Sequence, residues 1–243
     1  MKTAALWEWR TFLDPSIPRD EFWHRLPVDA ALRERLASRS RTRTDSYFDL
    51  DDIEIGLKGR AVQDATPRWL EAKVRTDHAG ETEQWVKILR TNRNSLIGLC
   101  RGEDADVERL TRLVRDDLGR SNEGLDDWQH RIESRATATG ARIIHIWKAR
   151  TQMLVARAGN TGWEVGDAGN ISTRQALVEC TELRLVQPGA APRSLGWTVC
   201  CEHHEREFVL EVAEQLLGGL GGRIMGYPAF VIHVREDLDR ADS

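Results

Sequence analysis

The chain has 243 residues, of which 40% are hydrophobic and nine are Trp. This length and composition exclude a disordered chain and allow one large domain, or two small ones, with a substantial core. The formal net charge of −4 provides no overall attraction to a nucleic-acid duplex or to an anionic membrane, so neither is an expected partner and any basic site must be local.

The chain contains four cysteines: Cys100, Cys180, Cys200 and Cys201. They show no repeated two-cysteine spacing of the kind found in disulfide frameworks and zinc ribbons, so we expect reduced thiols and a cytoplasmic protein. The N-terminal apolar run is interrupted by Glu8 and Arg10 and is too short for a signal peptide or a membrane span.

The first elements are a strand and two short helices. Residues 4–13 alternate as a strand does, which places Glu8 and Arg10 on one face. Two helices limited by prolines are expected next, ending at Ser38. The basic run 39–43, RSRTR, is expected to be a solvated connector, with phosphate contact at the mouth of a tunnel or cleft as the alternative.

Three segments of strand composition follow, at 45–60, 68–75 and 80–87. Each carries charges two residues apart, and side chains at that spacing share one face of a strand. The sets are Lys58 with Arg60, Glu71 with Lys73 and Arg75, and Glu81 with Glu83 and Lys87. A solvated sheet face is one interpretation and an enclosed polar face is the other. The acidic run 49–52, DLDD, lacks the Gly and the distal Glu of an EF-hand, so a hairpin turn is expected there.

The second half alternates between helical and strand periods. After a short strand at 95–101, apolar residues at helical spacing predict a helical hairpin over 103–140. Strands are expected again at 142–156, 161–165, 173–186 and 195–204. A helix over 205–217 and a final strand at 229–234 complete the chain. One α+β domain with a large antiparallel sheet or barrel is the expected fold.

A fourth strand repeats the basic spacing with Lys148 and Arg150. If three such basic faces converge, like charges within about 4–6 Å repel each other unless a polyanion or interleaved carboxylates offset them. Carboxylates on similar elements are Glu8, Glu71, Glu81, Glu83, Glu179 and Glu202. Cations that hold phosphate oxygens and carboxylates that hold Mg²⁺ or Mn²⁺ form the two halves of a metal-assisted phosphoryl-transfer site. The alternative is a set of surface salt bridges, worth about 0–1 kcal/mol each.

Taken in order, the motifs L-W-E-W-R, LKGR, LEAKVR, GETE, WKAR and VECT resemble those of the CYTH domain of the triphosphate tunnel metalloenzymes. This group includes thiamine triphosphatases, inorganic triphosphatases and class IV adenylyl cyclases. The resemblance implies one CYTH-like domain over residues 1–243, with the helical hairpin as an insertion at about 103–140. The implied fold is a tunnel-like antiparallel β-barrel of about eight strands with helices packed outside.

The resemblance also implies a function and a site. The implied activity is a divalent-metal-dependent phosphohydrolase, a triphosphatase, that acts on a small triphosphate or polyphosphate held in a basic tunnel. Glu8, Glu83 and Glu179 are the implied ligands of Mg²⁺ or Mn²⁺, and Lys73 and Arg10 are the implied catalytic residues. The implied phosphate-binding residues are Arg10, Lys58, Arg60, Lys73, Arg75, Lys148 and Arg150.

Two motifs depart from the family's pattern. Leu6 stands at the first Glu of the opening E-x-E-x-K strand, and Arg10 replaces its Lys, keeping the charge without the compact ammonium geometry. The late E-x-E strand keeps Glu179 but has Thr181. A non-catalytic CYTH-like protein that binds phosphate or another polyanion is therefore the alternative, and a scaffold with internal ion pairs is the third hypothesis.

Other chemistries find less support in the sequence. In a strand, Cys200, Glu202 and His204 face one way and Cys201 and His203 the other, so a zinc site is not expected among them. Neither a G-x-S-x-G motif nor a glycine-rich phosphate loop is present. The Trp residues are expected to pack the barrel, with a nucleoside held by one of them at the tunnel rim as the alternative.

Overall fold

The computed structural model of the chain describes residues 5–60, 69–92, 107–118, 126–140, 142–159, 162–167, 169 and 171–241. The strand expected at 95–101, together with Cys100, lies outside these residues. Within these ranges, every helix is too short or too polar to cross a membrane.

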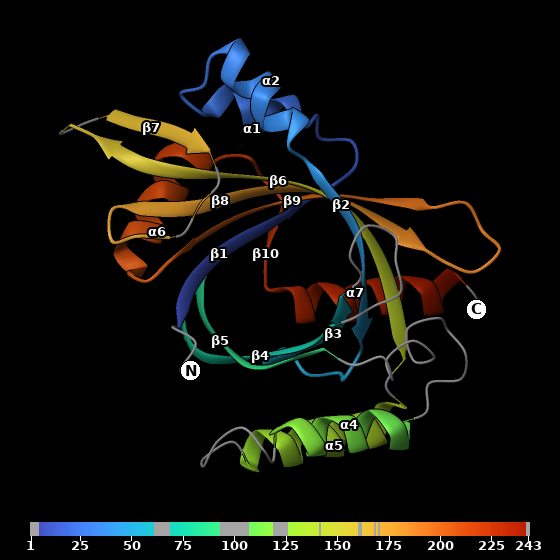
Figure 1. The fold of residues 1–243 in the computed structure, drawn as a ribbon. Helices are drawn as coiled ribbons and strands as arrows, with labels where there is room; N and C mark the ends of the chain where they lie inside the picture. Colours follow the sequence, from blue (N-terminus) through green and yellow to red (C-terminus); the bar gives the residue numbers. More distant parts are fainter. Residues whose placement is uncertain are drawn as a thin grey trace.

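Eight strands close into an antiparallel barrel (Figure 1). Their bounds are Leu6–Leu13 (β1), Arg41–Phe48 (β2), Ile55–Arg60 (β3), Trp69–Ala79 (β4), Thr82–Asn92 (β5), Ile143–Ala158 (β6), Gln175–Val186 (β8) and Arg193–His203 (β9). The order around the barrel is β1, β5, β4, β3, β2, β6, β8 and β9, and β9 pairs with β1 to close the ring. Two outer strands extend the sheet, Gly162–Asp167 (β7) on β6 and Arg223–Ile224 (β10) on β1. The predicted α+β fold with an antiparallel barrel is confirmed.

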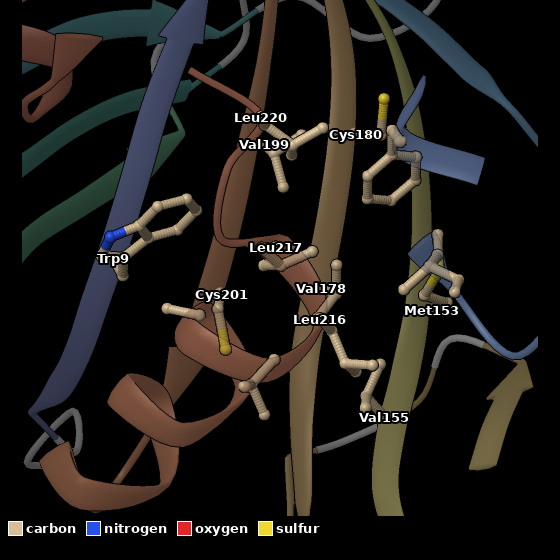
Figure 2. Packing of buried hydrophobic residues seen from close by; sticks show 14 of the residues in the cluster. Trp9, Met153, Val155, Val178, Cys180, Val199, Cys201, Leu216, Leu217 and Leu220 are labelled. Atoms are coloured by element: carbon tan, nitrogen blue, oxygen red, sulfur yellow. The ribbon is translucent and has the colours of Figure 1, made fainter. Parts of the chain in front are cut away.

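Helices cover the outer face of the barrel. Over β1, β9, β8 and β6 lie α1 (Asp20–Arg25), α2 (Ala30–Ser38), α6 (Arg206–Val212) and a π-helical turn, η1 (Ala213–Leu217). Figure 2 shows Trp9, Cys201 and Val178 of the strands around Leu216 and Leu217 of η1. The two helices of the predicted hairpin, α4 (Val107–Leu118) and α5 (Asp126–Thr139), cover β3, β4 and β5 (Figure 1). Much of the apolar core therefore lies outside the barrel.

The last element, α7 (Tyr227–Ala241), is a helix, so the strand predicted at 229–234 is wrong. A short apolar run such as AFVIHV has no period long enough to separate the two structures, whereas Pro228 suits the first turn of a helix. Phe230, Val231 and Val234 pack against Phe12, Tyr47, Ile144, Ile146, Leu183 and Leu185. These strand residues face the interior, because they alternate with outward-facing neighbours. Helix α7 therefore fills one end of the barrel.

The acidic run 49–52 forms the turn between β2 and β3, as expected. Its carboxylates anchor two helices. Asp49 Oδ2 forms an ion pair with Arg235 of α7 at 3.1 Å, and Asp52 accepts from Arg131 of α5 at 2.8 Å and 2.9 Å. This turn therefore holds α7 in the barrel end and α5 against the outer face.

Candidate functional site

The barrel encloses a cavity of about 230 Å³ between α7 and the opposite opening. Eight cationic side chains and four carboxylates line it. The cations are Arg10, Arg43, Lys58, Arg60, Lys73, Lys87, Lys148 and Arg150. The carboxylates are Glu8, Glu71, Glu179 and Glu202. The cavity is therefore polar and has an excess of positive groups.

Strand alternation explains why these side chains meet. In β3, Ile55 and Leu57 are buried beneath the outer helices, while Lys58 and Arg60 face the cavity. The same alternation turns the even-numbered charged residues of β6 and β1 inward. Lys58 with Arg60, Glu71 with Lys73, and Lys148 with Arg150 thus mark an enclosed face. The solvated-face interpretation does not hold for these sets, whereas Glu81 of the third set is exposed.

Asp45 lies at the centre of one group of cations and is 0% exposed. Its carboxylate is 2.9 Å from Arg43 Nε, 3.3 Å from Lys148 Nζ and 3.8 Å from Lys58 Nζ. Burial alone would raise the pKa of the Asp45 carboxyl, but the surrounding ammonium and guanidinium groups hold it well below its usual range. Asp45 is therefore a fixed internal anion.

Glu71 organises a second group of cations on β3, β4 and β5. Its oxygens lie 3.2 Å from Lys87, 3.3 Å from Arg60 and 3.5 Å from Lys58. Burial opposes the charge of Glu71, but these cations hold its pKa well below the usual range. One carboxylate thus holds three cations, and the group keeps a net positive charge.

Lys148 is enclosed by aromatic rings at the base of the cavity. Its Nζ donates to Tyr47 Oη at 2.5 Å and lies 3.6 Å from the ring centre of Tyr227 on α7. Burial lowers the pKa of Lys148 well below its usual value, and Asp45 opposes that shift. Burial likewise lowers the pKa of Lys58, to about 8, against the attraction of Glu71 and Asp45.

Several cations of the cavity keep donors without a hydrogen-bond partner among the described residues, Arg43 Nε and Arg60 Nε included. Lys73 forms no ion pair and donates no hydrogen bond to any residue in the described part of the chain. Arg10 donates from Nε to Glu8 Oε1 at 2.8 Å and lies over the Tyr227 ring, but its buried Nη1 has no partner among the described residues. Because an unsatisfied buried donor is costly, these groups favour an anion between them.

Two carboxylates meet on the wall formed by β1 and β9. Glu8 lies opposite Glu202 in the strand register, and their oxygens are within 4.8 Å of each other. Burial raises the pKa of Glu202, Lys73 opposes this shift, and Glu8 adds to it. A shared proton or a cation relieves two buried carboxylates at this distance. Carboxylate oxygens are the donors that Mg²⁺ and Mn²⁺ prefer, so this pair fits a divalent ion.

The predicted metal ligands are not all together. Glu179 lines the same cavity, where Arg150, Gln152 and Thr181 donate to it at 3.2, 3.1 and 2.9 Å. Burial opposes the charge of Glu179, but Arg150 and other cations set its pKa to about 2. Glu83 instead lines a smaller neighbouring hollow, which also includes Glu8 and Arg10.

Of the predicted phosphate-binding residues, six line the cavity and Arg75 does not. Arg75 donates to Glu83 at 2.8 Å and to Glu54 at 3.3 Å, near the end of β4. The Trp85 indole also donates to Glu83, at 3.1 Å. Strand alternation carries no information about the depth of Arg75 along the barrel, and its ion pairs lie apart from the residues that line the cavity.

Several site residues were not predicted. The run 39–43 was expected to be a connector, but β2 begins at Arg41, and Arg43 lines the cavity. The alternation of Arg43, Asp45 and Tyr47 was the available signal. The sequence identifies Glu202 as a candidate carboxylate but not as a metal ligand. Glu202 comes close to Glu8 only when β9 closes the barrel against β1.

No protein-family model matches the chain, and no curated protein sequence matches it. Among solved structures, the chain is similar to a conserved hypothetical protein from Pyrococcus furiosus. The two share 14% sequence identity and a TM-score of 0.40 over 91% of this chain and 94% of the other.

Proposed function

We propose that the chain is a CYTH-like protein that binds a small triphosphate or polyphosphate in its barrel and hydrolyses it with a divalent ion, Mg²⁺ or Mn²⁺. The motif order supports the family assignment, since LKGR, LEAKVR and WKAR come from three strands whose charged faces share one cavity. The polyphosphate is a small-molecule substrate, and the metal dependence is part of the proposal.

The observation that carries this proposal is the excess of cations in an enclosed space. Asp45 and the four lining carboxylates are outnumbered by eight cations. A scaffold held by internal ion pairs alone would balance its charges, because burying an unpaired charge is expensive. The buried Nη1 of Arg10 and Nε of Arg60 have no hydrogen-bond partner among the described residues. A chain of linked phosphates supplies several negative charges in a compact volume.

The size of the cavity favours a compact ligand. Sites for drug-sized molecules usually have about 300–1,000 Å³. The barrel cavity has about 230 Å³ and is closed by α7 at one end. A phosphate chain therefore enters with one end first, and an organic group attached to the other end would remain near the opening.

The proposed roles follow from position. Glu8 and Glu202 would hold the ion, with Glu179 nearby on the adjacent strand β8, and the bound ion would neutralise charge on the phosphate oxygens. Lys73 and Arg10 would donate to the oxygens of the reacting phosphoryl group, where charge develops during transfer to water. Lys58, Arg60, Lys148 and Arg150 would hold the remaining phosphates.

The first test is inorganic phosphate release from tripolyphosphate with Mg²⁺ or Mn²⁺, combined with the thermal shift that tripolyphosphate produces at low salt. We expect release and an increase in melting temperature. Lys73→Ala should abolish both, because it removes the unpaired cation. Asp51→Asn changes an exposed carboxylate on the β2–β3 turn and should preserve both. Absence of any thermal shift in the unchanged chain would eliminate phosphate binding.

A binding protein without turnover is the second candidate. Two of the carboxylates already form ion pairs with arginines, Glu8 with Arg10 at 2.8 Å and Glu179 with Arg150 at 3.2 Å. These ion pairs compete with metal binding. The same assay separates the two candidates. A thermal shift without phosphate release, in either metal, would support binding alone.

Arg43 provides a test of the cavity that is independent of the predicted motifs. Arg43→Ala should weaken tripolyphosphate binding by about tenfold to a hundredfold, because a hydrogen bond to a charged group contributes about 1.5–3 kcal/mol. Arg41→Ala is the matched control, since Arg41 lies on the same strand but is exposed. Isothermal titration of both variants measures the difference. If the two variants bind tripolyphosphate with equal affinity, the bound phosphates do not contact Arg43.

A further inference from the structure

The β9 strand brings a cysteine to the paired carboxylates. In the register of β1 and β9, Glu202 lies opposite Glu8, and Cys200 lies opposite Arg10. Cys200 and Glu202 share the inner face of β9 because they are two residues apart. Their ligand atoms and a Glu8 oxygen all lie within 4.8 Å of one another. His204 does not complete this set, since it is exposed beyond the end of the strand.

The Cys200 thiol has no other role in the described structure. It is 1% exposed, forms no disulfide, and makes no hydrogen bond to a described residue. The neighbouring Cys201 points the other way, into the apolar cluster around η1, and Cys180 also belongs to that cluster (Figure 2). Of the cysteines that the structure describes, Cys200 alone faces the two carboxylates.

We propose that Cys200 is a third ligand, through sulfur, of the divalent ion held by Glu8 and Glu202, so that the site prefers a thiophilic ion such as Zn²⁺ or Co²⁺ to Mg²⁺. This inference rests on the metal position of the proposed function and changes the identity of the ion. On binding, the Cys200 S–H bond breaks, a metal–sulfur bond forms, and the proton passes to solvent. No oxidation or reduction takes place.

The donor set gives the physical reason for the preference. Two carboxylates alone suit a hard ion, whereas thiolate sulfur selects softer ions. A thiophilic ion deprotonates a coordinating thiol outright, and Mg²⁺ gains little from sulfur.

Local charge supports the same assignment. Arg10 and Lys73 face Glu8 and contribute two positive charges beside this wall. Counting only Arg10, Lys73, Glu8 and Glu202, whose charges cancel, a dication would give a net charge of +2, and a thiolate reduces it to +1. Formation of the metal–sulfur bond thus lessens the repulsion between the ion and the two cations.

The test is a Co²⁺ titration of the full chain without phosphate, followed by ultraviolet and visible absorption. We expect a thiolate-to-cobalt charge-transfer band in the unchanged chain and in the control Cys201→Ser. In Cys200→Ser the band should be absent and Co²⁺ affinity lower by about tenfold or more. Excess Mg²⁺ should leave the band of the unchanged chain in place.

Several results would overturn the inference: absence of the band in the unchanged chain, its persistence in Cys200→Ser, or its loss on adding Mg²⁺ at a concentration equal to that of Co²⁺. The first and last need no variant, so a folding defect in Cys200→Ser leaves the inference testable. The tripolyphosphate shift, measured in parallel with chelator present, reports the phosphate site. A normal shift without a cobalt band would reject the sulfur ligand and leave the proposed phosphate binding standing.

Discussion

Asp45→Asn is expected to lower the free energy of unfolding by about 3–5 kcal/mol, the range found when one partner of a buried ion pair is removed. The carboxylate is fully buried between Arg43, Lys58 and Lys148. Asparagine preserves the volume and one carbonyl oxygen but leaves three cations without their common anion. Urea denaturation at neutral pH, where the carboxyl of the unchanged chain is ionised, measures the loss.

The same variant distinguishes a structural ion cluster from a ligand site. If the cluster faces bound phosphate, tripolyphosphate should stabilise Asp45→Asn more than it stabilises the unchanged chain, because the ligand replaces the missing negative charge. Asp167→Asn is the control, since its carboxylate is 42% exposed and pairs with Arg39 on the surface. That change should cost about 0–1 kcal/mol. A similar small loss for Asp45→Asn would show that the interior cations do not depend on Asp45.

The face of each charged strand was predictable because alternation is a local property. Lys58 with Arg60, and Lys148 with Arg150, need only an extended backbone to share a face, and the outward position of Leu57, one residue before the first pair, fixes which face is inward. The cationic residues that line the cavity were therefore predictable from the sequence without any knowledge of strand order.

Other features depend on contacts between distant segments. Glu202 meets Glu8 only because β9 closes the barrel against β1, and Tyr227 reaches Lys148 only because α7 enters the barrel end. The run AFVIHV alone is too short to separate a strand from a helix, but over the whole element Tyr227, Phe230, Val231, Val234 and Leu238 recur at helical spacing, so that longer window carries the signal for α7. Arg43 was missed for another reason, since its basic neighbours gave the start of β2 the composition of a loop.

The barrel interior has two parts, an apolar end filled by α7 and a charged cavity beyond it. Near α7, Phe12, Ile146 and Leu183 meet apolar side chains of the helix, and this part is filled. Farther along the same strands, Arg10, Lys148 and Glu179 line the cavity. The apolar part lowers the local dielectric around the charged part, which strengthens every ion pair and raises the cost of any cation left unpaired.

Glu179→Gln is expected to remove about 3 kcal/mol of pH-dependent stability between about pH 4.3 and about pH 2. Burial disfavours the charged carboxylate, but Arg150 and other cavity cations lower its pKa from 4.5 to about 2 in the folded chain. A lowered folded-state pKa means that the contribution is fully present above the pKa of the unfolded chain. It is lost as pH falls toward the folded-state value.

Chemical denaturation across that range, with chelator present and phosphate absent, measures this contribution. Stability of the unchanged chain should fall more steeply with acid than that of Glu179→Gln. Some slope should remain in the variant, because Arg10 and Lys73 outweigh burial and lower the pKa of Glu8 to about 2 as well. Glu182→Gln is the matched control, since Glu182 lies on the same strand in a partly exposed pair with Arg184. Parallel acid profiles for the unchanged chain and Glu179→Gln would contradict a cationic cavity around Glu179. A difference confined to that variant would locate the positive field at this carboxylate.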